Sequence, residues 1–250
     1  MLSHRLHVVT KFLVPTAVLA VLAAALGGCS TSGMINGNGK MTDGSVAYDG
    51  AITTINVSDV TAELALSPAS GSSVTYTIDE NLAADLSVAV SDGVLTIKSK
   101  DGKSLNSSHN ITFNVSSDKL AAISTAGSVK VTGQGTFTAD TFKLDVSGAA
   151  TGTLALSAQD VSLTISGAAN MELTGTTNKL EIKNSGAAVI KARGLASQDA
   201  TVSVDGAGTV EVSASGTLDA SVSGVGTVTY WGNPTLSENT SGVASVKQGS

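Results

Sequence analysis

Ser147-Gly148-Ala149 is the first full copy of a three-residue motif that recurs along the second half of the sequence. The later copies are Ser166-Gly167-Ala168, Ser185-Gly186-Ala187, Asp205-Gly206-Ala207, Ser223-Gly224-Val225 and Ser241-Gly242-Val243, and a degenerate copy stands upstream at Ser124-Thr125-Ala126. The first residues of neighbouring copies lie 18 to 23 positions apart. A period near 20 residues is typical of a solenoid, in which each repeat forms one coil.

Apolar residues alternate with polar ones on both sides of the motif. In the copy at 166–168, Val161, Leu163 and Ile165 precede the motif and Met171 and Leu173 follow it. Alternation with period two predicts strands that bury one face, and equivalent strands of successive coils must run in the same direction. The sequence therefore predicts an all-β chain with a parallel β-helix over residues 119–250, in coils of about 18–20 residues. The absence of a six-residue period favours the right-handed form.

Some positions of the repeat have a predicted structural role. We expect the motif to be the corner of each coil, with glycine needed for its backbone conformation and serine for hydrogen bonds from coil to coil. Asn184 stands in an otherwise apolar column and is expected to bond backbone at its corner. In the last coil Glu238, Thr240 and Gln248 replace apolar residues, as expected where the stack ends in water.

Residues 46–118 alternate in the same way but lack the motif. Asp92-Gly93 lies between two alternating runs and indicates a hairpin, since a type I′ turn needs positive φ at both central residues. This irregular, strand-rich part is expected to cap the solenoid through antiparallel pairing or irregular first coils. A cap is needed because a first coil otherwise offers an unpaired edge.

The N-terminus has the pattern of an export signal. Arg5 and Lys11 form a basic region, an apolar run follows, and Leu26-Gly27-Gly28 precedes Cys29, the only cysteine. This resembles the lipobox of bacterial lipoproteins, which implies a signal peptide over 1–28, lipid attachment and membrane anchoring at Cys29, and a flexible tether over 29–45. By the same resemblance, Ser30 favours the outer membrane. The alternative is an ordinary secretory signal with a chance cysteine.

Charge and composition exclude some partners. The chain has 14 basic and 20 acidic residues, and loss of residues 1–28 would remove two of the basic ones. An acidic surface argues against nucleic acid and against anionic lipid headgroups. With its single cysteine assigned to lipid, the mature chain has no disulfide, so the stacked strands alone must hold the fold.

Several motifs together resemble the head GIN domain family of auto-transporter adhesins. They are the repeated Ser-Gly-Ala pattern, Tyr230-Trp231-Gly232-Asn233-Pro234, Asp79-Glu80-Asn81-Leu82 and Asp92-Gly93-Val94-Leu95, and the resemblance covers about residues 48–247. Thr125 at the first glycine position, Asp205 for serine and valine for the last two alanines depart from the pattern. The resemblance implies an exported adhesin-like protein and brings no catalytic residues.

Many parallel β-helices act on polysaccharides, so catalysis is one function that this fold allows. The mature chain has one arginine, Arg193, and one histidine, His109, while the acidic residues of the coils are dispersed. Asp199 and Asp205 flank one strand but point outward. The sequence therefore predicts no catalytic residue, cofactor or metal site, and no enzyme.

The predicted function is that of a non-catalytic, lipid-anchored cell-envelope protein, an adhesin or scaffold that binds an unknown protein or glycan through its β-helix surface. Two alternatives stay open, a polysaccharide-binding accessory module and a degenerate, pectinase-like carbohydrate-active enzyme. A sugar-binding module would rely on Trp231 as its aromatic platform, although this ring is more readily interpreted as a cover for the final turn with Pro234.

Overall fold

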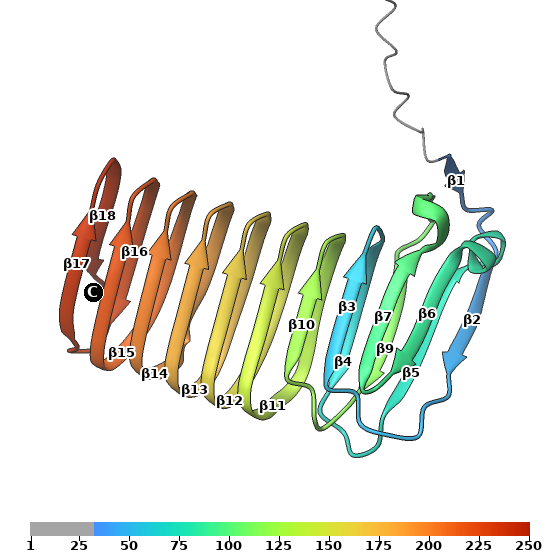
Figure 1. Ribbon diagram of the computed structural model, residues 1–250, viewed down its shortest axis with the longest axis horizontal. Helices are drawn as coiled ribbons and strands as arrows, with labels where there is room; N and C mark the ends of the chain where they lie inside the picture. Colours follow the sequence, from blue (N-terminus) through green and yellow to red (C-terminus); the bar gives the residue numbers. More distant parts are fainter. Residues whose placement is uncertain (1–32) are drawn as a thin grey trace, which may run out of the picture. The chain divides into compact units, whose positions relative to one another are not determined.

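Parallel coils stack in one direction along the chain in the computed structural model, which describes residues 33–250 (Figure 1). The predicted parallel β-helix is confirmed, with about seven turns. Its regular part consists of β10 (Ala122–Thr125), β11 (Ser128–Val146), β12 (Ala149–Ile165), β13 (Ala168–Asn184), β14 (Ala187–Val204), β15 (Ala207–Val222), β16 (Val225–Trp231), β17 (Thr235–Thr240) and β18 (Val243–Gln248). Each long strand runs from one corner to the next and pairs in parallel with its sequence neighbours.

The predicted inward columns form the core. Val161, Leu163 and Ile165 are buried, and so are Met171 and Leu173 on the other side of the corner. The register also brings a third residue inward directly after the corner, a column that includes Ala150, Ala169 and Ala188 and that the alternation had not indicated. The core is therefore made of stacked aliphatic side chains, one layer per coil.

The Ser-Gly-Ala motif forms the corner, as predicted, but glycine is needed for a different reason. Among the corner glycines of the described residues, positive φ occurs at Gly242 alone. Instead, a Cβ at Gly167 would lie 1.9 Å from the carbonyl oxygen of Gly148, and one at Gly148 would lie 2.1 Å from that of Gly127. Glycine is required because backbones of successive corners approach each other more closely than a side chain allows.

The first corner differs from the prediction. Thr125 pairs with Val146 and Ser128 pairs with Ala149, which places Gly127 beneath Gly148. The first corner is thus 126–128, and the assignment of Ser124-Thr125-Ala126 was wrong by two residues. The error arose because the residues flanking Gly127 are alanine and serine in reversed order.

The N-terminal part contains further coils stacked out of sequence order. Its elements are β1 (Met34–Asn36), β2 (Met41–Val46), β3 (Thr54–Ser58), β4 (Thr61–Ser67), β5 (Ser73–Asp79), the 3₁₀ helix η1 (Glu80–Asp85), β6 (Leu86–Ser91), β7 (Val94–Ser99), the 3₁₀ helix η2 (Lys100–Gly102), β8 (Ser104–Asn106) and β9 (Ile111–Ser116). The coil of β3 and β4 lies between that of β10 and β11 and that of β7 and β9 (Figure 1). The chain therefore leaves the stack after β4, builds the cap, and returns on the near side of β3.

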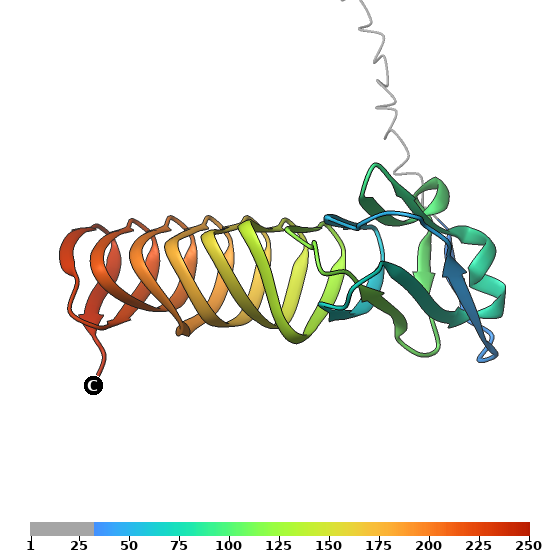
Figure 2. The same cartoon turned by 90° about the horizontal axis from the view of Figure 1, so that it is seen from below.

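Antiparallel strands close the far edge of the stack. β6 pairs with β7, β5 pairs with β9, and β2 covers β5. Asp92 and Gly93 both have positive φ between β6 and β7, which agrees with the predicted hairpin. Figure 2 shows the change from regular coils to this capping sheet. The edge that would follow β7 and β9 is thus occupied by the chain itself.

The structure differs from the sequence prediction between residues 33 and 46. Met34–Asn36 and Met41–Val46 form β1 and β2, although the prediction placed residues 29–45 in a flexible tether. β1 pairs in parallel with β8, and β2 pairs with β5. These segments are short, and Gly37 and Gly39 stand between them, so their alternation does not indicate strands. The predicted signal peptide and Cys29 lie outside the described residues.

Candidate functional site

A gap in the coil stack leaves part of β11 without a neighbour. β11 pairs with β4 through residues 128–133 and with β10 through residues 143–146. Between these two segments, among the described residues, no strand pairs with residues 134–142 on the side away from β12. The cause is the excursion to the cap, because the chain departs after Ser67 and re-enters only at Ala121. Within residues 33–250, the preceding coil therefore lacks the strand segment that would pair with residues 134–142.

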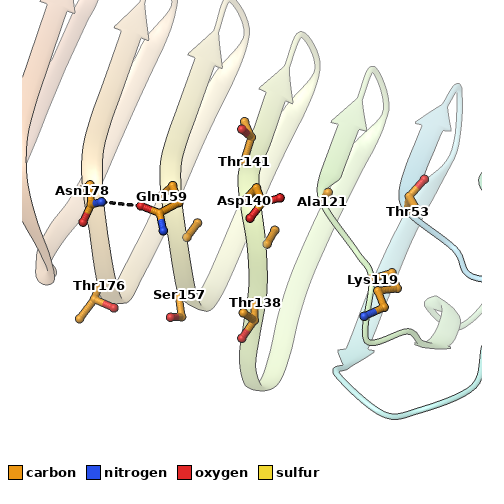
Figure 3. A pocket seen from close by; sticks show the side chains of 12 residues that line it. Thr53, Lys119, Ala121, Thr138, Asp140, Thr141, Ser157, Gln159, Thr176 and Asn178 are labelled. Atoms are coloured by element: carbon orange, nitrogen blue, oxygen red, sulfur yellow. Dashed lines mark hydrogen bonds between the residues drawn. The ribbon is translucent and has the colours of Figure 1, made fainter.

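A groove of about 840 Å³ lies at this gap, and we call it the polar groove (Figure 3). Its residues come from three successive coils and from the wall where the chain re-enters the stack. They are Thr53, Lys119, Ala121, Thr138, Ala139, Asp140, Thr141, Ser157, Ala158, Gln159, Thr176 and Asn178.

Hydroxyl and amide groups dominate the lining of the groove, and register explains why. Thr138 pairs with Ser157, which pairs with Thr176, so outward side chains of three coils form one row. Asn178 donates a hydrogen bond of 2.5 Å from Nδ2 to Oε1 of Gln159, which links two amides of adjacent coils. The row presents a regular set of donors and acceptors to whatever enters the groove.

Two opposite charges lie in the groove. Lys119, on the wall, has a side chain that is 65% exposed and is 3.9 Å from the carboxylate of its neighbour Asp118. Asp140 is exposed on β11. The groove can therefore form hydrogen bonds and weak ionic contacts with a ligand. Among the described residues, no hydrogen bond joins a hydroxyl of the groove to Asp140, as a nucleophile and its base would require.

Asp79 lies in a separate polar cluster in the cap. Its buried carboxylate accepts hydrogen bonds from the hydroxyls of Ser107 (2.5 Å) and Ser108 (2.6 Å) and from the N–H of Gly39 (2.7 Å). These donors, Ser107 first, hold the pKa of Asp79 well below its ordinary value. A Cβ at Gly37 would overlap this carboxylate, so β1 and the following loop are fixed against it. The cluster joins β1 to the cap.

His109 stands beside this cluster without forming a catalytic triad. The hydroxyl of Ser108 lies 3.0 Å from Nδ1 of His109 and also bonds the carboxylate of Asp79. In a triad the imidazole lies between the carboxylate and the hydroxyl, whereas here the hydroxyl lies between the other two groups. Ser108 therefore has its hydroxyl engaged by a structural carboxylate.

Arg193 and Trp231 contact each other across two coils. The guanidinium carbon of Arg193 lies 4.4 Å from the centre of the Trp231 ring, a cation–π contact. Gly249 lies against the edge of the same ring, and the indole Nε1 is buried with no hydrogen-bond partner. The ring is half-buried and its face is occupied, so it is not the open platform that a sugar stacks on. This agrees with its interpretation as a cover.

Asn184, Asp199 and Asp205 have structural partners. Asn184 is buried and bonds the carbonyl of Ala207 and the N–H of Gly186, as predicted. Asp199 is half-buried and accepts hydrogen bonds from the N–H and the hydroxyl of Thr217. Asp205 is exposed and accepts hydrogen bonds from the hydroxyls of Ser203 and Ser223, so the two carboxylates have separate partners.

Within residues 33–250, no three His, Cys, Asp or Glu side chains are grouped so that they could hold a metal ion. Over the same residues, no helix is long and apolar enough to cross a membrane.

The family described as "Putative auto-transporter adhesin, head GIN domain" matches residues 53–234. The chain belongs to the head GIN domain family. The match spans the polar groove, the hairpin at Asp92-Gly93 and all the corner motifs up to Ser223-Gly224-Val225. No curated protein matches the sequence.

Solved structures share the fold of this head GIN domain protein. One is a "putative adhesin" of Bacteroides fragilis NCTC 9343, with a TM-score of 0.79 and 21% identity over 86% of this chain and 99% of that one. A "putative lipid binding protein" of Parabacteroides distasonis ATCC 8503 has a TM-score of 0.68 and 19% identity over 87% of this chain and 100% of that one. A "putative adhesin" of Parabacteroides merdae ATCC 43184 has a TM-score of 0.60 and 18% identity over 87% and 100%. At these identities the likeness concerns the fold.

Proposed function

We propose that this head GIN domain protein is a non-catalytic, lipid-anchored adhesin of the cell envelope that binds its partner in the polar groove. The observation that carries the proposal is the groove itself, a hollow of about 840 Å³ lined by hydroxyl and amide groups from stacked coils. The family and the adhesins of similar fold support a binding role. Arg193 stacks on Trp231 and the hydroxyl of Ser108 bonds Asp79, and these contacts argue against a hydrolase or lyase site at either residue.

The partner is a protein or a glycan of the surroundings. Thr138, Gln159 and Asn178 lie on separate coils and contribute to the hydrogen-bonding capacity of the groove. Cells that display the protein should adhere to a matrix or to other cells, and the combined variant Thr138→Ala, Gln159→Ala, Asn178→Ala should lose that adhesion. The matched control is Thr151→Ala with Thr209→Ala, two exposed hydroxyls on the opposite side of the corner. Equal adhesion of both variants would remove the groove from the proposal.

The proposed anchor is lipid on Cys29 after removal of residues 1–28, and the proposed location is the outer membrane, which Ser30 favours by resemblance to other bacterial lipoproteins. Two or three acyl chains at about 0.8 kcal/mol per buried methylene would hold it stably. Labelled palmitate should enter the wild-type protein and not Cys29→Ala. Incorporation into the variant would contradict the anchor.

An adhesin must also face outward. External protease added to intact cells should degrade the protein, with a periplasmic protein as the protected control. If the chain is fully protected from external protease, it faces the periplasm. The groove would then bind a periplasmic partner, and adhesion would be contradicted.

A further inference from the structure

The open edge of β11 offers backbone groups as well as side chains. The N–H of Lys143 bonds the carbonyl of Ala121, toward the preceding coil. Because backbone groups alternate sides along a strand, the N–H of Thr141 points the same way, into the groove. Between residues 134 and 142 the structure, over its described range, gives these backbone groups no partner on that side. We call this segment the open edge.

Other parts of the chain bound the open edge at both ends. Pro68 packs beside Gly135 at one end, and Lys119 and Ala121 form the wall at the other. Residues 136–142 bend near Asp140, as the coils beside them do, so that Phe137 and Phe142 are both buried although they are five positions apart. The end of the solenoid of a second copy would have to fit a complete coil between these walls. A single extended segment needs only the spacing of one strand beside β11, about 4.8 Å.

The other edge of the same strand indicates what fits. Residues 136–139 and 141–142 pair there in parallel with β12, whose residues 155–161 have the sequence Ala-Leu-Ser-Ala-Gln-Asp-Val. The groove side carries the same chemistry, with Ala139 and Ala158 between hydroxyls and amides. An entering segment with small and hydroxyl side chains would continue the coil-to-coil contact that holds the rest of the solenoid.

We propose that the open edge binds an extended Ser/Thr/Ala-rich segment of a partner protein as an added β-strand. The backbone groups of residues 134–142 provide the affinity, as in other cases of strand addition. Lys119 and Asp140 select a segment that carries an acidic residue near one end and a basic or amide residue near Asp140. This inference rests on the proposed function, since it names the partner class of the same groove.

The test uses the full-length chain in detergent and a fluorescently labelled, end-capped peptide with the sequence of residues 155–161. Thr141→Pro removes the N–H that faces the groove, and Thr141→Ala removes the hydroxyl at the same position but keeps the N–H. Loss of one hydrogen bond with its acceptor left unpaired should weaken binding about tenfold in Thr141→Pro. Thr141→Ala should stay within about threefold of the wild type.

Hydrogen exchange on the wild-type protein gives a measurement that does not depend on whether the proline variant folds. The peptide should slow exchange of backbone amides within residues 134–142 and leave those of β15 unchanged. No protection of the open edge, or equal binding by Thr141→Pro and Thr141→Ala when both fold, would overturn strand addition.

The experiments distinguish failure of strand addition at the open edge from failure of adhesion through the polar groove. If adhesion depends on Thr138, Gln159 and Asn178 but the peptide gives no protection, strand addition fails while the binding groove stands. Binding of a neutral oligosaccharide that is lost in those side-chain variants and kept in Thr141→Pro would likewise overturn strand addition in favour of a glycan. If adhesion does not require the groove, yet the peptide protects the open edge, the adhesin role fails and strand addition stands.

Discussion

Single residues fix the spacing of the coils. Gly167 is the clearest case, because a Cβ there would overlap the carbonyl oxygen of Gly148 at 1.9 Å and neither backbone can move without shifting its whole coil. The neighbouring Ser166 is exposed. Two adjacent residues of one motif therefore have very different tolerance to change.

Gly167→Ala should lower the free energy of unfolding by about 2 kcal/mol or more, since an extra methyl group must be fitted between two backbones. Ser166→Ala, in the same corner, should change it by less than about 0.5 kcal/mol. Urea denaturation followed by circular dichroism measures both. Equal stability of the two variants would show that the close approach is not needed.

Asp79 is a second residue whose contribution can be isolated, through pH. Its donors Ser107 and Ser108 lower its pKa in the folded state, so its stabilising contribution is complete above the ordinary carboxyl pKa of about 3.9. As pH falls below about 4 toward the lowered folded pKa, that contribution is lost.

The stability difference between wild type and Asp79→Asn should therefore be constant from pH 5 to 7, within about 0.5 kcal/mol of scatter, and shrink below about pH 4. Thermal unfolding across this range measures the difference. Asp43→Asn, at an exposed position of β2 where the carboxylate accepts a hydrogen bond from Thr77, is the control with a smaller effect. A difference that grows on acidification would contradict the proposed ionised state.

At the level of strands, the sequence predicts what repeats and fails where the chain departs from the repeat. The corners and the inward columns around Leu163 or Met171 could be predicted because apolar side chains recur at fixed spacing. The coil of β3 and β4 could not be recognised because Val60 stands at the position of the corner glycine, and the corner has an additional residue, Asp59, at a φ of 57°. The open edge could not be predicted, since it results from the absence of a strand, which leaves no pattern in the residues beside it.

The last strands also show how the open end of the stack is protected. β17 pairs with β15 on one side, and its residues are all exposed. Glu238 continues the inward column of Ala220, and an inward charge on an edge strand disfavours pairing with another chain.

Glu238→Val should therefore promote association of the ends, seen as concentration-dependent dimers or larger species in light scattering. Ser237→Val adds the same side chain to the outer face of β17 and should stay monomeric under the same conditions. Association of both variants to the same extent would point to general hydrophobicity rather than to the inward charge.

For residues 33–250 as a whole, each regular coil contacts mainly its two neighbours, so stability varies along the stack. The cap end is held by antiparallel strands and by the cluster around Asp79. The other end has a neighbour on one side only. Unfolding should begin at β17 and β18, and Trp231, the only tryptophan, lies where it can report this.

Arg193 links Trp231 to a coil two positions further into the stack. The Arg193–Trp231 contact should therefore determine the urea concentration at which this end unfolds. In urea, the fluorescence of Trp231 should change at a lower concentration than the circular dichroism of the strands. Arg193→Ala should lower the fluorescence midpoint, by an amount equivalent to about 1 kcal/mol, and leave the dichroism midpoint nearly unchanged. Lys191→Ala, an exposed residue on the same strand, is the control. Coincident transitions in wild type and variant would mean that the stack unfolds as a single unit, and the gradient of stability would then be wrong.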